Sequence, residues 1–113
     1  MAEDANRVRY KAPDDAAAII DLMRGPQGPP GRLGVGTVHH IAFRTPTDEQ
    51  QHEWRNDLTK RGHSVTPIID RKYFHSIYYR EPGGVLFEIA TDPPGFAIDE
   101  PAEHLGERLV LPD

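Results

Sequence analysis

The chain has 113 residues, a formal charge of −5 and no cysteine. This length suits one domain with a modest core. The negative charge argues against a nucleic-acid or anionic-membrane partner, because both are bound through basic patches. The lack of cysteine excludes disulfides and thiolate chemistry. No apolar run approaches the roughly 20 residues that span a bilayer, and the N-terminus lacks a hydrophobic signal, so we expect a cytoplasmic protein.

Two short segments near the N-terminus have strand-like patterns. Residues 6–12 alternate Val8 and Tyr10 with basic side chains, which predicts an edge strand with its charges in water. Residues 16–23 fit either a helix capped by Asp15 or a second strand. The strand is favoured, because a hairpin would satisfy the edge that the first strand leaves open.

A break in composition follows this hairpin. Residues 25–31 are rich in proline and glycine, which fix or reverse the backbone and remove hydrogen-bond donors. We therefore expect residues 1–31 to form an N-terminal hairpin and linker, and residues 32–113 to form a separate module with an irregular C-terminal tail.

The module is organised around two segments that carry polar groups in apolar surroundings. Residues 36–44 and 84–91 are short, rich in β-branched and aromatic residues, and bounded by turn residues, as strands are. The first contains His39 and His40. The second contains Glu88, with apolar neighbours on both faces of the predicted strand.

A carboxylate at position 88 needs a partner. Leaving an ionised carboxylate unpaired in an apolar strand costs several kcal/mol or more. One possibility is an ion pair between Glu88 and Arg71 or Arg80. The other is a cation shared with a histidine, since imidazole and carboxylate together suit Fe(II), Mn(II), Ni(II) or Zn(II).

A helix is expected over residues 47–61. It could begin with Thr45 as the cap and proline in the first helical position, or with Thr47 as the cap of a capping box. Trp54 and Leu58 lie four residues apart and form a narrow apolar stripe. We expect this stripe to place the helix on the sheet.

Two further strands complete the predicted sheet. Residues 64–70 are interrupted by Pro67, which indicates an edge or bulged strand. Residues 73–80 are followed by a turn of the proline-glycine-glycine type. If that turn is a three-residue hairpin loop, Tyr78 lies opposite Glu88 and on the same face.

The predicted order is strand, helix, and three strands, an α+β arrangement. With a histidine on its first strand and a glutamate on its last, it resembles one βαβββ module of the vicinal oxygen chelate (glyoxalase-like) superfamily. Residues 36–44 and 70–96 are similar to the C-terminal module of hydroquinone-type ring-cleaving extradiol dioxygenases. The similarity extends from residue 36 to about residue 112.

The resemblance implies roles for five residues. His40 and Glu88 would be two of the three ligands of Fe(II), or alternatively of Mn(II) or another divalent metal. His39 would be a hydrogen-bonding neighbour of the ligand. Arg71 and Tyr78 would orient or polarise a hydroxyl of a small aromatic substrate that reacts with dioxygen.

The resemblance also implies that part of the site lies elsewhere. Proteins of this kind are considerably longer, and their third ligand is a histidine of an N-terminal module that this chain lacks. Residues 6–24 resemble the last two strands of the preceding module. We therefore expect a homodimer or pairing with a missing N-terminal module, with a second subunit, His75 or His39 as candidate sources of the third ligand.

Two functions remain open at this point. The first is a metal-dependent ring-cleaving dioxygenase of hydroquinone or catechol type, or a partial subunit of one. The second is a noncatalytic dimeric module that binds a small aromatic ligand or a partner chain. A glyoxalase-like isomerase is a weaker third, since it would need a second acid/base carboxylate. If His40 and Glu88 were on opposite faces of the sheet, the enzymatic interpretation would fail.

Overall fold

The computed structural model describes residues 2–4, 6–13, 18–26 and 28–111. Internal contacts divide the chain into two compact units, residues 1–30 and residues 31–113.

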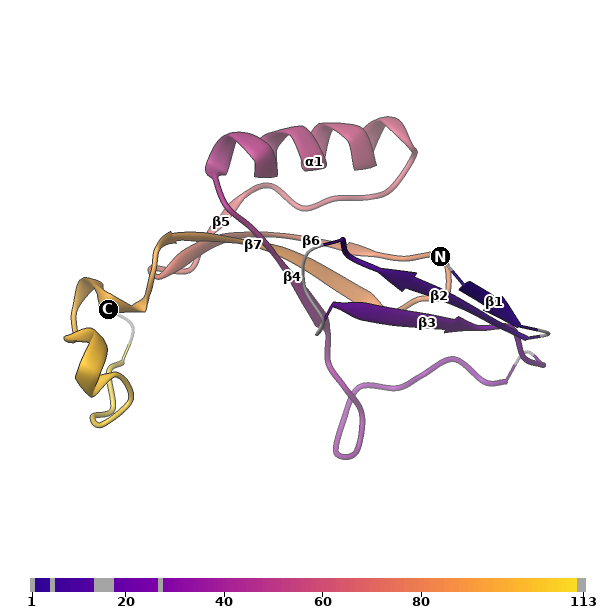
Figure 1. Cartoon of the computed structure of the whole chain (residues 1–113), viewed down its shortest axis with the longest axis horizontal. Coiled ribbons are helices and arrows are strands. Elements are labelled where there is room, and N and C mark those ends of the chain that lie inside the picture. The colour runs from indigo at the N-terminus through magenta and orange to yellow at the C-terminus, as the bar shows by residue number, and fades with distance from the viewer. Residues whose placement is uncertain (1, 5, 14–17, 27, 112–113) are drawn as a thin grey trace. The chain divides into compact units, whose positions relative to one another are not determined.

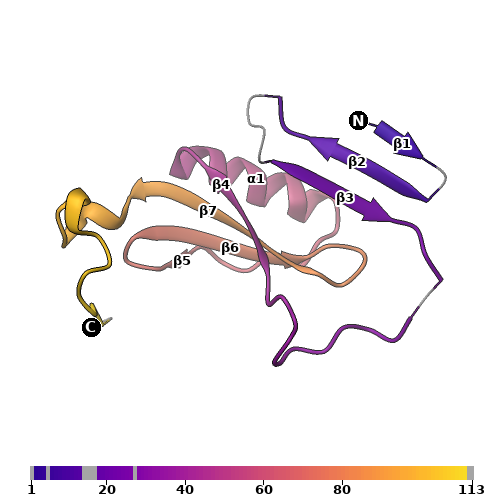
Figure 2. The same cartoon turned by 60° about the horizontal axis from the view of Figure 1, so that its bottom comes forward.

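The first unit is a small antiparallel sheet. Its strands are β1 (Ala2–Asp4), β2 (Arg7–Lys11) and β3 (Ile19–Met23), in the order β1-β2-β3 (Figure 2). The prediction of a hairpin is thus confirmed for β2 and β3, whereas residues 14–17 lie outside the described residues. The prediction of β2 as an edge strand is wrong, because β1 pairs with its other side.

The second unit is a mixed sheet with one α-helix. In chain order it consists of β4 (Ile41–Thr45), α1 (Asp48–Lys60), β5 (Ile69–Asp70), β6 (Phe74–Arg80) and β7 (Leu86–Pro94). The strand order is β4-β7-β6-β5; β4 runs parallel to β7 and the other neighbours are antiparallel. Figure 1 shows α1 lying along one side of this sheet. The α+β class and the βαβββ order are confirmed.

Several strand boundaries differ from the prediction. β4 begins at Ile41, so the two histidines come just before the strand rather than within it. Of the strand expected at residues 64–70, only β5 at its end forms. Pro67 has no N–H to donate to a ladder. The preceding residue, Thr66, is hydrogen-bonded to β6: its N–H donates to the Tyr78 carbonyl, and its hydroxyl oxygen accepts from the Tyr78 N–H.

The helix begins at the second of the two predicted caps. Thr47 is the N-cap, and its hydroxyl oxygen accepts a hydrogen bond from the Gln50 N–H at 3.1 Å. The hydroxyl of Thr45 donates to the side chain of Gln50 instead. The apolar stripe does not mark the buried side of α1, because Trp54 is 47% exposed while Gln51 is completely buried.

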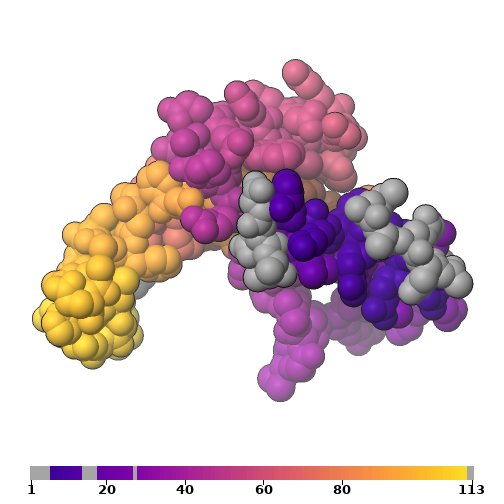
Figure 3. Space-filling view, in the orientation of Figure 1, coloured from indigo at the N-terminus to yellow at the C-terminus, as the bar shows by residue number. Residues whose placement is uncertain are grey.

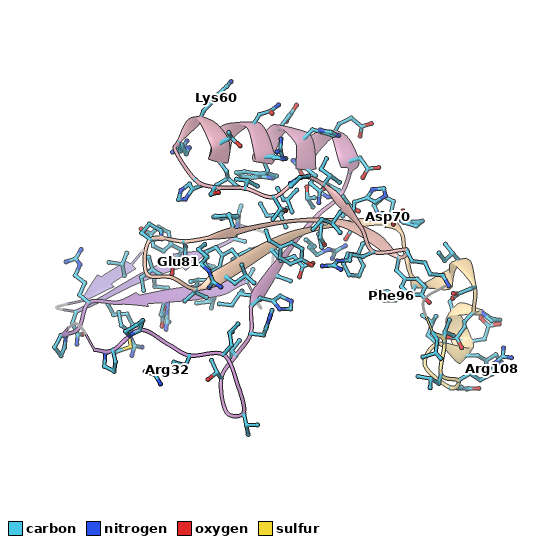
Figure 4. All side chains as sticks on the ribbon, turned by 180° about the vertical axis from the view of Figure 1, so that it is seen from behind. Arg32, Lys60, Asp70, Glu81, Phe96 and Arg108 are labelled. Atoms are coloured by element: carbon cyan, nitrogen blue, oxygen red, sulfur yellow. The ribbon has the colours of Figure 1, made fainter. Side chains whose placement is uncertain are left out.

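Alternation along β6 and β7 gives the sheet two different faces. The helix face bears Ile77, Phe87 and Ile89 and packs against α1, whose Gln51 side chain hydrogen-bonds to the β6 and β7 backbones. The site face bears Ser76, Tyr78 and Glu88. Figure 4 shows α1 along one side of the sheet, with Glu81 at the β6–β7 turn and Asp70 near the opposite end.

The segment after β7 forms a lobe at one end of this unit (Figure 3) and contains two short 3-10 helices, η1 (Phe96–Ile98) and η2 (Ala102–His104). The ring of Phe96 stacks on Tyr73 with centroids 5.1 Å apart. Asp99 accepts hydrogen bonds from Lys72 and Tyr73, which hold the pKa of Asp99 below its usual range. In the described part of the chain, no helix has the length and apolar character needed to cross a bilayer.

Candidate metal centre

Glu88 is the third residue of β7 and is almost completely buried, with 4% of the residue exposed. It pairs with Tyr78 across the β6–β7 ladder, as the three-residue turn predicted. A buried carboxylate at this position requires compensation from its neighbours.

The two carboxylate oxygens of Glu88 have different partners. Oε1 accepts hydrogen bonds from the hydroxyls of Ser76 at 2.5 Å and Tyr78 at 2.8 Å. Oε2 lies 2.9 Å from Nε2 of His40. The two arginines that the sequence offered as partners of Glu88 have other contacts: Arg80 donates to the Gly84 carbonyl, and Arg71 lies over the Tyr78 ring.

His40 reaches Glu88 because β4 runs parallel to β7, with Ala42 paired to Glu88 and His40 two residues earlier. Its Nδ1 is 3.0 Å from Nδ1 of His39, so one of these two nitrogens donates and the other accepts. This contact turns Nε2 of His40 toward the carboxylate. The contact is the one that the resemblance implied between His39 and His40, and the role of His39 beside a metal ligand stays a prediction.

Arg71 is presented by a tight turn between β5 and β6. Asp70 accepts a hydrogen bond from the Lys72 N–H, Lys72 has a φ of 69°, and the Arg71 N–H donates to the Phe74 carbonyl. The guanidinium carbon of Arg71 is 5.5 Å from the centre of the Tyr78 ring, within the range of a cation–π contact. The five predicted site residues therefore form one connected cluster.

The donor atoms of His40 and Glu88 fit a divalent ion. Metal bonds to histidine nitrogen and carboxylate oxygen are about 2.1 Å long, so two such donors at right angles on one ion lie about 3 Å apart. The observed separation is 2.9 Å. His40 is partly exposed and Glu88 is buried, so an ion could approach from the side of the imidazole.

A third ligand is not found in this cluster. Among the residues that the structure describes, no group of three or more His, Cys, Asp or Glu side chains could hold a metal ion. His75 was a candidate, and that suggestion is wrong: its Nδ1 lies 2.6 Å from Asp48 of α1, on the helix face. The hydrogen bond with Asp48 raises the pKa of His75 above its ordinary value.

Three residues that support the site were not identified from the sequence. Ser76 was given no role from the sequence, and it proves to be a direct partner of Glu88. Gln51 and Thr91 are buried and hydrogen-bond to the backbone beside Ser76. The one available signal was the position of Gln51, three residues before Trp54 on the predicted buried side of the helix.

Comparisons with known proteins find similar sequences and a similar fold. The chain is 50% identical over 112 residues to "Putative ring-cleaving dioxygenase MhqO" of Bacillus subtilis, covering 99% of this chain and 36% of that protein. It is 40% identical over 117 residues to "Chlorohydroquinone/hydroquinone 1,2-dioxygenase" of Sphingobium indicum, covering 98% and 36%. A crystal structure of a putative dioxygenase from Bacillus subtilis matches with a TM-score of 0.89 and 51% identity, over 97% of this chain and 35% of that one.

The chain thus spans about a third of the length of these relatives. The family model described as Glyoxalase/Bleomycin resistance protein/Dioxygenase superfamily matches residues 2–89, which is most of the chain. The chain therefore belongs to the glyoxalase/bleomycin resistance protein/dioxygenase superfamily.

Proposed function

We propose that this chain is the metal-carrying part of a ring-cleaving dioxygenase that acts on a hydroquinone or a related small aromatic compound. The observation that carries the proposal is the 2.9 Å contact between His40 Nε2 and a buried Glu88, with Tyr78 and Arg71 beside it. The names of the relatives support the reaction class, and the one from Sphingobium indicum supports the substrate class.

His40 and Glu88 would hold Fe(II), or alternatively Mn(II) or another divalent ion. Such an ion would supply a place where a ring hydroxyl and dioxygen can bind together. In a ring-cleaving dioxygenation a ring carbon–carbon bond breaks, both atoms of dioxygen enter the product, and the ring supplies the electrons.

The other residues of the cluster would act on the substrate directly. The Arg71 guanidinium stabilises negative charge on a ring oxygen that has lost its proton. The Tyr78 hydroxyl can donate a hydrogen bond to the same oxygen. His39 holds the His40 imidazole through their 3.0 Å contact, as partners of metal-bound histidines commonly do.

We further propose that residues 32–113 are the functional module and that residues 1–31 belong to the end of a preceding one. The cluster has two ligands, so the third would come from outside the described residues. Either a second copy of the chain supplies it, as a homodimer, or a separate N-terminal module does.

Oxygen uptake tests this function directly. The untagged protein is loaded anaerobically with Fe(II), mixed with hydroquinone and placed in an oxygen electrode, with Glu88→Gln as the matched variant. Uptake by the wild type that disappears in the variant is expected, and sedimentation velocity at the same concentration shows whether the active species is a dimer.

Absence of iron binding and oxygen uptake would contradict the proposal. If the wild type takes up neither iron nor oxygen, alone or when combined with an N-terminal module of a relative, the dioxygenase proposal is wrong. The lack of a third ligand among the described residues would then favour a noncatalytic module that binds an aromatic ligand or a partner chain.

A further inference from the structure

The hydroxyl of Ser76 is completely buried and points at the carboxylate of the candidate metal centre. Ser76 has no exposed surface, and its Oγ donates to Oε1 of Glu88 at 2.5 Å. The Tyr78 hydroxyl donates to the same oxygen at 2.8 Å. Oε1 therefore has two donors, whereas Oε2 faces His40.

Ser76 and Tyr78 differ in whether a substrate can also reach their hydroxyls. A hydroxyl has one proton to donate, so Tyr78 cannot donate to Glu88 and to a substrate oxygen at once. Tyr78 is only half-buried and close to Arg71, so a substrate can reach it. Ser76 is inaccessible and can stay on Oε1 when Tyr78 leaves it.

The β6–β7 ladder is irregular just before Ser76. Its register shifts between the pairs Phe74–Pro94 and Ser76–Ala90, so that His75 alone lies opposite three residues of β7, 91–93. The Thr91 hydroxyl oxygen accepts from the His75 N–H at 2.9 Å, and the Gln51 amide donates to the His75 carbonyl at 2.8 Å. Ser76 itself stays in the regular register, two residues before Tyr78, and therefore lies on the same face as Glu88. The contacts at His75 hold the strand just before it.

We infer that Ser76 is a positioning residue for Glu88: it keeps Oε1 occupied, so that Glu88 offers a metal the single oxygen Oε2 and Tyr78 is free to turn to the substrate. The inference rests on the proposed function for the identity of the metal centre. One-oxygen binding leaves a coordination position open that a two-oxygen carboxylate would fill.

Infrared spectroscopy of the Glu88 carboxylate tests the inference. The asymmetric and symmetric carboxylate stretches are further apart when one oxygen binds a metal than when both do, and the bands of Glu88 are identified by subtraction of Glu88→Gln. With Mn(II) as the probe, the wild type should show the wide separation. In a Tyr78→Phe background, where Ser76 is the hydroxyl donor that remains on Oε1, Ser76→Ala should narrow it and weaken Mn(II) binding by about 10- to 100-fold, as loss of a ligand's hydrogen-bond partner does.

Two variants serve as comparisons. Tyr78→Phe should keep the wide separation, because Ser76 still occupies Oε1; a narrow separation in this variant would overturn the inference even if Ser76→Ala did not fold. Ser64→Ala, at an exposed position outside the strands, should match the wild type. A folded Ser76→Ala/Tyr78→Phe double variant with wild-type band separation and Mn(II) affinity would also overturn the inference.

The metal-free protein separates this inference from the proposed function. If the wild type binds no Mn(II), the proposed metal centre fails, but the Glu88 bands of the metal-free protein still report on Ser76. Ser76→Ala should shift the asymmetric stretch, because a hydrogen bond to the carboxylate is lost. A Glu88 band that does not move would overturn the role of Ser76.

Discussion

The two faces of the same sheet differ in what their buried residues do. On the helix face, Ile77 and Ile89 are buried and apolar, as a core requires. On the site face, Ser76 and Glu88 are equally buried but polar, and they are joined to each other by a hydrogen bond. Successive residues of β6 and β7 alternate between these two environments.

The comparison shows how a small unit can hold a buried charge. Burial of the apolar face against α1 stabilises the sheet, and the rigid sheet then fixes the hydroxyl donors around Glu88. The faces are connected through the backbone at His75, where Gln51 and Thr91 bind from the core. Substitutions on one face should therefore affect the other only through this connection.

The largest expected effect is on the helix face. Ile77→Ala removes a side chain with no exposed surface and should lower the free energy of unfolding by about 2 to 5 kcal/mol. Urea denaturation measures this change. Under conditions where the variant remains folded, its Mn(II) affinity should equal that of the wild type. A loss of Mn(II) affinity in the folded variant would show that the two faces are not independent.

A smaller effect is expected at the connection. Gln51→Leu keeps the side-chain volume but removes the amide that donates to the carbonyls of His75 and Ile89. The free energy of unfolding should fall by about 1 to 3 kcal/mol. Gln51 Oε1 is buried and has no hydrogen-bond partner among the described residues. Its removal is favourable, so we expect a loss of stability at the lower end of this range. Urea denaturation measures this loss.

Unlike Ile77→Ala, Gln51→Leu should also shift the infrared bands of Glu88, because the backbone at His75, next to Ser76, loses its support. Bands identical to those of the wild type would show that the two faces are independent at this point.

The smallest expected effect is the pH dependence of the His75–Asp48 pair. Because the pKa of His75 is raised in the folded state, its stabilising contribution is complete below the unfolded pKa of about 6.5 and is lost as pH rises through the folded pKa. The loss should be under about 1 kcal/mol, since both side chains are partly exposed. Denaturation between pH 5 and 9 should show the decline in the wild type and in a His52→Gln control, but not in Asp48→Asn.

The register of the site could be predicted because it depends on local rules. A short turn after β6 and the two-residue period of strands suffice to place Tyr78 opposite Glu88. The helix limits were predicted almost to the residue, because Thr47 has a strong capping side chain. The need of a buried carboxylate for a partner indicated an arginine or a cation shared with a histidine, and the resemblance to ring-cleaving dioxygenases implied His40.

The remaining features depend on contacts between distant parts of the chain. The bulge at His75 is stabilised by Gln51, 24 residues earlier, and no local pattern indicates it. Trp54 was expected in the core because it is apolar, but the helix is turned so that Gln51 is buried instead. The two-residue period places Ser76 on the face of Glu88, but its hydrogen bond to Oε1 depends on the side-chain conformations of both residues, which the sequence pattern does not give.

The central claim is that one ion binds both His40 and Glu88, and a double-mutant cycle of Mn(II) binding tests it most directly. Dissociation constants are measured by electron paramagnetic resonance of free Mn(II) for the wild type, His40→Ala, Glu88→Gln and the double variant. If both side chains hold the same ion, each single variant should lose at least about 100-fold in affinity, more than the loss of an outer partner causes, and the double variant should lose little more. Wild-type affinity in either single variant would contradict the account.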